Sequence, residues 1–392
     1  MRDCQKIHSF KRDCPVYISD REEVIVDRRD EVAIKEQRLR AFMDSTGLKG
    51  ILLKRQPSYS WFTAGGKNWV SISMDIGFST LLVTPKEKFC VANRIESARN
   101  MEEEGLEDLS FTLLEYEWYE GSEMDCIKKV VPIDKVGCDM PLEGTQFIGD
   151  EIKSLRYSLT PPEIERYLWL GEKTSRAVET VLMEMKQGDT EAEITGEMTR
   201  LLWRDGIGQV GYQAAADNRV YKYRHPIPTE RKIERYVMLN VMSRKWGLNI
   251  TITRLMHFGK APEKLKKQYK DNVYIECAMI AATRPGVVTG DIFRKTCDLY
   301  EELGYKDEWR LHHQGGAMGY DIRDTIVTSA STEKVQVDQC FCWNPSMAGT
   351  KSEDGFIAQK EGFVFLTQSV LFPTLKIQAE GIDFIRPNIL ER

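Results

Sequence analysis

Four short polar motifs, lying in sequence between apolar runs, constrain the fold of this 392-residue chain more than any other feature. They begin at His225, Gly247, His312 and Trp343, and read HPIPTERKIERYVMLNV, GLNITITRLMHFG, HHQGGAMGYDIRD and WNPSMAGTKSEDGF. Of the chain's five histidines, four lie in or beside these motifs, namely His225, His257, His312 and His313. Composition alone would not concentrate histidines in this way, so the motifs mark a candidate cleft.

Composition excludes several classes of protein. A hydrophobic content of 42% over 392 residues favours a substantial core divided between two domains. The net charge of −5 argues against nucleic acid or anionic membrane as partners. We find no apolar run near the roughly 18 residues that span a bilayer, and no secretory signal at the N-terminus. Nine cysteines without a CxxC pair favour a cytoplasmic location, and Cys340 and Cys342 are expected to be core thiols.

The first part of the chain has the pattern of an α/β domain. Residues 1–30 are dense in charge and are interpreted as an extension or an edge element. A helix is expected over 30–45, and strands and helices then alternate for about a hundred residues, which is typical of an α/β domain. We place this domain at residues 1–157.

The second part, residues 158–392, has the pattern of an α+β domain. Thr160 followed by Pro161-Pro162 is a strong signal for the start of a helix. Helices are expected over 262–283 and 289–303, apart from a series of strands that includes 324–329.

The order and placement of the four motifs resemble those of the pita-bread hydrolase family of creatinase, aminopeptidase P and prolidase. The Thr-Pro-Pro-Glu-Ile string at Thr160 and the Gly-Asp-Thr-Glu turn at Gly188 strengthen the resemblance, which covers most of the chain. It implies an α+β protein in which an N-terminal creatinase-like α/β domain precedes a C-terminal pita-bread domain. It also implies a homodimer.

Most members of that family hold two divalent metals with two Asp, one His and two Glu. The eleven-residue spacing of the first two ligands is kept here, but a single carboxylate remains. The five matching positions are Asn240, Thr251, Gly316, Asn344 and Glu353. Leaving the charge of two dications largely unpaired would cost several kcal/mol per ion, and neutral Asn or Thr oxygens bind such ions weakly. We therefore predict that the site holds no metal and no other cofactor.

One interpretation is metal-free catalysis, which the resemblance to creatinase supports. His225 occupies the segment from which creatinase draws its catalytic histidine, and a histidine can take and return a proton near neutral pH. Glu353, or Asp354, would hold its tautomer or protonate a leaving nitrogen. His312 matches a family histidine expected to contact substrate, so we favour it over His313. The alternative is that His312 and His313 only satisfy backbone groups.

The candidate substrate-binding residues indicate a small anion. Arg224, Arg254 and Arg323 would bind a carboxylate, as in an amino-acid derivative, a dipeptide-like molecule or an N-substituted glycine. A structural role in ion pairs is at least as plausible for Arg254. Further candidates are neutral groups that orient the substrate or satisfy one another, and an aromatic lid residue for which core packing is the default. These are Asn240, Asn344, Thr251, His313 and Trp61.

Three functions remain open from the sequence. The first is metal-independent hydrolysis of a C–N bond in a small carboxylated substrate, with His225, Glu353 and His312 as catalytic residues. The second is a non-catalytic binding or regulatory member of the family. The third is an Xaa-Pro peptidase with residual use of metal.

Overall fold

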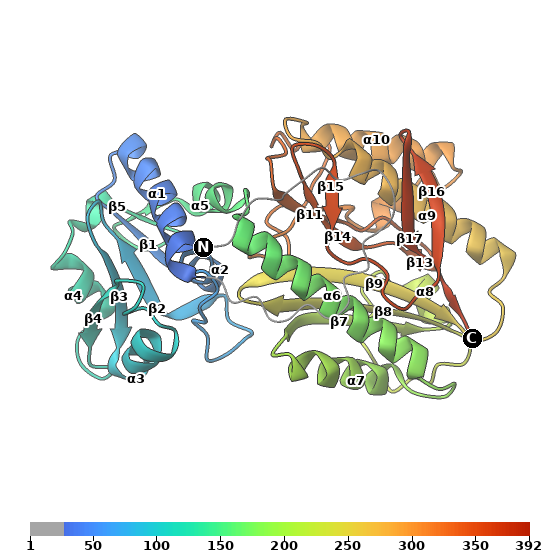
Figure 1. Ribbon diagram of the computed structural model, residues 1–392, viewed down its shortest axis with the longest axis horizontal. Coiled ribbons are helices and arrows are strands. Elements are labelled where there is room, and N and C mark those ends of the chain that lie inside the picture. The colour runs from blue at the N-terminus through green and yellow to red at the C-terminus, as the bar shows by residue number, and fades with distance from the viewer. Residues whose placement is uncertain (1–26) are drawn as a thin grey trace, which may run out of the picture.

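A computed structural model describes residues 27–392, which form two lobes side by side (Figure 1). Most of the charged segment at 1–30 lies outside the described residues. The helix expected over 30–45 is confirmed as α1, Arg28–Thr46, which ends at Gly47 in the left-handed conformation. Within residues 27–392, no helix has the length and apolar character needed to cross a membrane.

The N-terminal lobe is built on a mixed six-stranded sheet with the order β4-β3-β2-β1-β5-β6. Its strands are β1 (Gly50–Arg55), β2 (Ile76–Val83), β3 (Lys88–Asn93), β4 (Thr112–Tyr116), β5 (Val136–Cys138) and β6 (Gln146–Phe147). Its other helices are α2 (Gln56–Phe62), α3 (Arg94–Ala98), α4 (Glu123–Lys128) and α5 (Gly149–Arg156). The boundary predicted at 157/158 falls between α5 and the next helix, α6.

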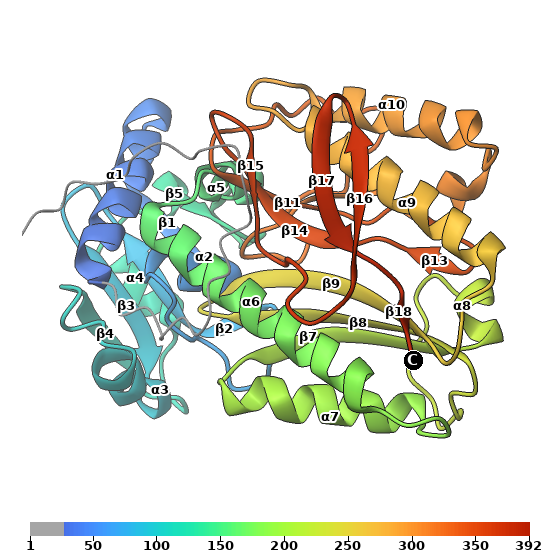
Figure 2. The same ribbon diagram turned by 45° about the vertical axis from the view of Figure 1, so that its right-hand side comes forward.

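Helix α6 (Pro161–Glu184) opens the C-terminal lobe. Thr160 accepts a hydrogen bond from the backbone of Glu163, whose carboxylate accepts one from the backbone of Thr160, so both ends of the capping box are present. Helices α6 and α7 cover one face of the sheet β18-β9-β8-β7 (Figure 2). The members of this layer are α7 (Glu191–Arg204), β7 (Gly208–Ala216), α8 (Asn218–Lys222), β8 (Tyr236–Lys245), β9 (Leu248–His257) and β18 (Leu390–Glu391).

A second layer packs against β9 from the other side. It contains a four-stranded sheet, β10-β11-β14-β15, two short hairpins and two long helices, of which α9 packs on β16. Its helices are α9 (Glu263–Ala282) and α10 (Thr289–Glu302). Its strands are β10 (Gly315–Ala317), β11 (Gln339–Trp343), β12 (Ser346–Met347), β13 (Thr350–Lys351), β14 (Asp354–Ala358), β15 (Phe363–Phe365), β16 (Thr374–Ala379) and β17 (Ile382–Pro387). The predicted α+β class is confirmed.

One strand prediction is wrong. Residues 324–329 form an irregular segment that follows β10 without becoming a strand. Asp324 donates its backbone N–H to the carbonyl of Ala317 at 2.9 Å, and Val327 donates to that of Gly315 at 3.0 Å. The apolar and β-branched residues there reflect this local pairing beside a glycine-rich strand.

A continuous core and a buried charge network join the two lobes. One hydrophobic cluster includes Leu39 of α1 together with Leu170 of α6 and Ile250 of β9. Lys35 of α1 forms ion pairs with Glu31 and, at 2.8 Å, with Glu163 of α6, and all three side chains are fully buried. The lobes are therefore held in one arrangement, which fixes the elements around the candidate site.

Candidate functional site

Glu353 lies at the centre of a buried polar cluster between the β8–β9 hairpin and the second layer. Strands β8 and β9 pair so that Asn240 faces Thr253, and both side chains donate to Glu353 Oε2 at 2.8 Å. Thr251 lies on β9 two residues before Thr253, and its hydroxyl is 2.8 Å from Cys342 Sγ of β11. The structure thus brings together three of the five matched positions, Asn240, Thr251 and Glu353.

Two side-chain cations hold Glu353. Lys351 Nζ lies 2.8 Å from Oε2, and Arg323 Nη2 lies 3.0 Å from Oε1. Burial alone would raise the pKa of Glu353, but the charges of Lys351 and then Arg323 outweigh it and hold that pKa below its usual range. Arg323 also donates to the Thr251 hydroxyl at 3.3 Å. Glu353 is therefore a fixed carboxylate whose oxygens are already occupied by donors.

The fourth position, Gly316, has no room for a ligand side chain. A Cβ built on Gly316 would lie 2.1 Å from the carbonyl oxygen of Thr325, in the segment that follows β10. At the fifth position, Asn344 is 2% exposed, and its Oδ1 has no hydrogen-bond partner among the described residues. Neither position supplies a charged oxygen or an imidazole.

Three histidines converge beside this cluster. One ring nitrogen from each of His225, His312 and His313 lies within 4.8 Å of the other two. His225 Nε2 and His312 Nε2 are 2.9 Å apart, and the rings of His312 and His313 stack with centroids 4.5 Å apart. His312 is 7% exposed, whereas His225 is exposed. The structure thus places the three histidines that the sequence singled out next to one another, as a pair and a stack.

The hydrogen bond between the pair has a favoured direction. His312 Nδ1 is buried and has no partner among the described residues. If His312 accepted at Nε2, its neutral ring would leave a buried N–H at Nδ1 without an acceptor. If it donates from Nε2, Nδ1 is only an unused lone pair. Because an unpaired buried donor is the costlier defect, we assign the proton to His312 Nε2, which donates to His225.

Burial and neighbouring cations keep the histidines neutral. Burial, with the charge of Lys351, lowers the pKa of His312 to about 2. Burial, with the charge of Arg323, lowers that of His313 to about 4. Burial and Lys351 also lower the pKa of His225. Neutral imidazoles are metal ligands in general, but the positive field that lowers these pKa values also opposes a divalent cation.

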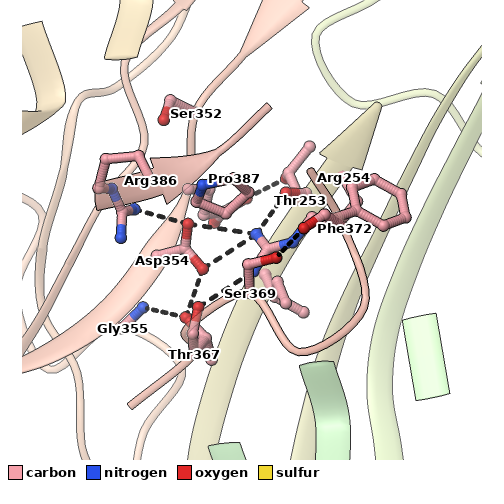
Figure 3. A network of polar contacts seen from close by, with 12 residues as sticks. Thr253, Arg254, Ser352, Asp354, Gly355, Thr367, Ser369, Phe372, Arg386 and Pro387 are labelled. Carbon is pink, nitrogen blue, oxygen red and sulfur yellow. Dashed lines mark hydrogen bonds and ion pairs between the residues drawn. The ribbon is translucent and has the colours of Figure 1, made fainter. Parts of the chain in front are cut away.

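Arg254 has a structural role, so the prediction that it binds substrate is wrong. It is 1% exposed, and it donates to Glu179 at 2.9 Å and to Asp354 at 3.0 Å. Figure 3 shows Asp354 between Arg254 and Arg386, whose Nη2 lies 2.6 Å from the carboxylate. This ion-pair network fixes β14 next to Glu353 and leaves no group free for substrate.

Of the remaining predicted residues, one pairs with a different carboxylate and one lies in the core. Arg224 forms an ion pair with Glu308. Trp61 is 0% exposed, its carbonyl accepts from Lys35, and it belongs to the core cluster shared by the two lobes. The prediction of Trp61 as a substrate-facing lid is therefore wrong, because its ring is needed for packing.

Two participants were not predicted, Lys351 and Thr253. The sequence did contain a signal for Lys351, because residues two apart on an extended segment point to the same side. Lys351 and Glu353 have that spacing in the KSEDG string. Cys340 and Cys342 are buried, as expected for core thiols, and burial raises the pKa of Cys342 to about 12.

Comparisons with known proteins agree on family and fold. A family model described as Metallopeptidase family M24 matches residues 169–372. An uncharacterised peptidase of Staphylococcus aureus strain MW2 is 23% identical over 224 residues, which are 55% of this chain and 64% of that protein. The match thus spans slightly less than two thirds of that relative's length.

Three solved structures share the fold. The Xaa-Pro dipeptidase from Bacillus anthracis has a TM-score of 0.73 at 19% identity, covering 92% of this chain and 100% of that chain. The prolidase from Pyrococcus horikoshii has a TM-score of 0.72 at 17% identity, with 86% and 99% covered. The N-terminal domain of the FACT complex subunit SPT16 from Cicer arietinum has a TM-score of 0.65 at 12% identity, with 86% and 97% covered. The predicted pita-bread architecture is confirmed.

Proposed function

The chain belongs to metallopeptidase family M24, and we propose that side-chain cations replace the family's two metal ions in it. The observation that supports this most is the double ion pair of Glu353 with Lys351 and Arg323. A metal ion at Glu353 would have to displace one of these cations or lie next to both. Since like charges repel strongly where water is excluded, the residues present do not fit a dinuclear centre.

The crowding at Gly316 supports the same proposal. The carbonyl of Thr325 fills the space into which a histidine ligand would extend. Moving that segment would break its hydrogen bonds to β10, including those of Asp324 and Val327. Restoring single ligands is therefore not expected to restore metal binding.

We infer that the site carries out metal-independent hydrolysis of a C–N bond in a small carboxylated substrate. The Glu353 cluster has two cations and one carboxylate in direct contact, so a substrate carboxylate next to Lys351 or Arg323 would be attracted. His225 is exposed and neutral, and it carries the acid–base role. Catalysis requires the other tautomer of the pair, which reverses the resting hydrogen bond: His225 Nε2–H donates to His312, and His225 Nδ1 has the free lone pair that a base needs. A water molecule attacks the carbon and forms the new C–O bond, His225 Nδ1 takes the proton of that water, and the C–N bond breaks. The same proton then passes to the leaving nitrogen.

The structure changes one part of the predicted mechanism. His225 is paired with His312 rather than with a carboxylate, and no described contact joins His225 to Glu353. In the proposed mechanism His312 therefore orients His225, while Glu353 holds Lys351 and Arg323 in place.

The experiment compares turnover with and without metal. Purified full-length protein, after elemental analysis, is assayed with N-substituted glycines and with Xaa-Pro dipeptides, in a chelator and with added manganese, cobalt or zinc. Turnover that persists in the chelator and is lost in His225→Ala supports the proposal. Turnover only with added metal would contradict it and favour an Xaa-Pro peptidase with residual metal use.

A second candidate function is binding without catalysis. It is favoured by the occupancy of Glu353, whose oxygens accept from Asn240 and Thr253 as well as from both cations. Glu353 is then not free to assist His225. One protein of this fold is named as a complex subunit rather than as an enzyme. A carboxylated compound that raises the melting temperature but is never turned over would favour this candidate. The predicted homodimer is tested separately, by light scattering of the full chain.

A further inference from the structure

A cavity of about 490 Å³ lies between the two lobes, apart from the site described above. It is lined by α2 and the loop after it, by the end of α7 and the start of β7, and by the turn between β8 and β9. None of its lining residues belongs to the Glu353 cluster or to the three histidines. Its volume falls within the range of about 300–1,000 Å³ that is usual for small-ligand sites.

The cavity carries an excess of positive charge. Apart from Lys245, four Lys or Arg side chains line it, against two Glu side chains among the described residues. Among them, Arg166 is 3% exposed and pairs with Glu31 at 2.7 Å, but its Nε is buried without a partner within residues 27–392. This N–H is a donor that a bound acceptor would satisfy.

Arg244 provides a second unsatisfied guanidinium in the wall. In the part of the chain that the structure describes, no carboxylate lies within ion-pair distance of Arg244. Burial lowers the pKa of Arg244, and Asp75, whose charge acts in the opposite direction, already pairs with Arg55 at 2.7 Å. A partly buried cation without a counter-ion favours binding of an anion.

Several aromatic rings also line the wall, and the turn between β8 and β9 is specialised to present one of them. This two-residue turn has φ of 53° at Trp246 and 77° at Gly247. Turns of this kind strongly favour Asn or Gly, so a tryptophan with positive φ is an outlier that calls for a functional explanation.

Close packing fixes Trp246 in this conformation. A Cβ on Gly65 would lie 2.9 Å from the Cβ of Trp246, and a Cβ on Gly247 would lie 2.3 Å from that of Ser60. The ring of Trp246 meets that of Trp169 edge-on, with centroids 5.2 Å apart. Trp69 and Trp203 also line the cavity, and Trp203 is 49% exposed.

We propose that this cavity binds a small anion that carries a flat aromatic ring, with a nucleoside monophosphate as the representative ligand. Arg166 and Arg244 would bind the oxyanion, since guanidinium groups pair with phosphate and carboxylate alike. The tryptophans would stack on the ring. This site is independent of the proposed hydrolase function.

The test is titration of the protein with small molecules, with binding measured by calorimetry and by tryptophan fluorescence. The probes are adenosine monophosphate, indole-3-acetate, adenosine and inorganic phosphate. We expect saturable binding of at least one of the first two, at least tenfold tighter than that of adenosine or phosphate. Tighter binding of adenosine monophosphate would identify the preferred oxyanion as phosphate, and tighter binding of indole-3-acetate would identify it as carboxylate. Equal binding of adenosine and its monophosphate, or no saturable binding of any probe, would overturn the proposal.

Two variants locate the binding. Arg244→Gln and Trp203→Ala are each expected to weaken binding at least tenfold. Trp203 is half exposed, so its truncation should leave the melting temperature unchanged. Arg231→Gln is the control, because Arg231 is an exposed arginine in the segment before β8, at the other end of that strand from Trp246. Unchanged affinity in Trp203→Ala and Arg244→Gln, or an equal loss in Arg231→Gln, would refute the assignment.

Discussion

Replacing Glu353 with Gln tests whether this residue now serves as the counter-ion of Lys351 and Arg323. Glu353 is 3% exposed, and both cations lie within 3.0 Å of its carboxylate. In Glu353→Gln the two cations would face a neutral amide in a space with little water. Asn240 and Thr253 would keep an acceptor only if the amide oxygen turned toward them. The loss is therefore mainly electrostatic.

The expected cost follows from the number of charges left unpaired. Removing one partner of a buried ion pair typically costs about 3–5 kcal/mol. Arg323 retains some exposure, with 11% of its side chain accessible, so we expect about 3 kcal/mol. At about 2–4 °C per kcal/mol for a domain of this size, the melting temperature should fall by roughly 6–12 °C.

A double-mutant cycle isolates the contribution of the ion pair. Lys351→Met removes one cation and leaves Glu353 with Arg323, at a cost of about 1.5–3 kcal/mol for a lost charged hydrogen bond. The double variant Lys351→Met/Glu353→Gln leaves only Arg323 unpaired, so it should be more stable than the sum of the single effects predicts, by about 1–3 kcal/mol. Urea unfolding followed by fluorescence, at neutral pH in a chelator, gives the four free energies.

Two results would refute this reasoning. Additive effects of the two substitutions would mean that Lys351 does not compensate Glu353. A large drop in the melting temperature of the unmodified protein on adding the chelator would mean that metal, rather than Lys351 and Arg323, balances the carboxylate. Glu361→Gln serves as the control, since Glu361 is exposed and lies in the turn between β14 and β15, and it should change stability by less than about 0.5 kcal/mol.

Two further predictions concern acid and Gly316. Because the pKa values of His312 and His313 are lowered to about 2 and about 4, the unfolded chain binds more protons below about pH 6.5. Stability should thus be complete above that pH and fall by up to about 1.4 kcal/mol per pH unit for each histidine as the pH drops toward 4. In melts from pH 7 to 4, His312→Gln should show a shallower fall than the unmodified protein, and parallel curves would refute the effect. Gly316→Ala should lower stability by about 1–3 kcal/mol, because its Cβ would press on the carbonyl of Thr325. Gly196→Ala in α7, where a Cβ meets nothing within 4 Å, should instead raise stability by about 0.5–1 kcal/mol; a Gly316→Ala protein as stable as the unmodified one would show that the segment at Thr325 moves easily.

Short sequence signals, such as helix caps, correctly predicted the helices whose ends depend on neighbouring residues. The cap at Thr160 marks the start of a helix that the structure confirms, and the helix expected over 30–45 is also found, ending at Gly47. Helix α2 was not predicted, because all of its side chains are buried and its sequence QPSYSWF has no amphipathic period. The segment 324–329 has the composition of a strand, but tertiary pairing with glycine-rich β10 determines its conformation.

In the candidate site, too, some features followed from the sequence and others depend on how the fold brings distant residues together. The motifs predicted that Asn240, Thr251 and Glu353 lie close together, and the structure places them so, because β8 and β9 form a regular hairpin. The sequence did not reveal that His225 pairs with His312, since 87 residues separate them and one lies in a loop. It also did not show that Arg254 pairs with Glu179 and Asp354 whereas Arg323 pairs with Glu353, because these pairings depend on which carboxylate the fold brings near.

Charge balance connects the altered site to its proposed substrate. In the family, four carboxylates offset the four positive charges of two dications, so the filled site is close to neutral. Here Lys351 and Arg323 face Glu353 alone, and this direct cluster has one positive charge in excess. A monoanionic substrate would restore neutrality, whereas a neutral peptide bond remote from any carboxylate would not. If side-chain cations replace the metals as proposed, this fold should prefer small molecules whose carboxylate lies next to the bond that is broken.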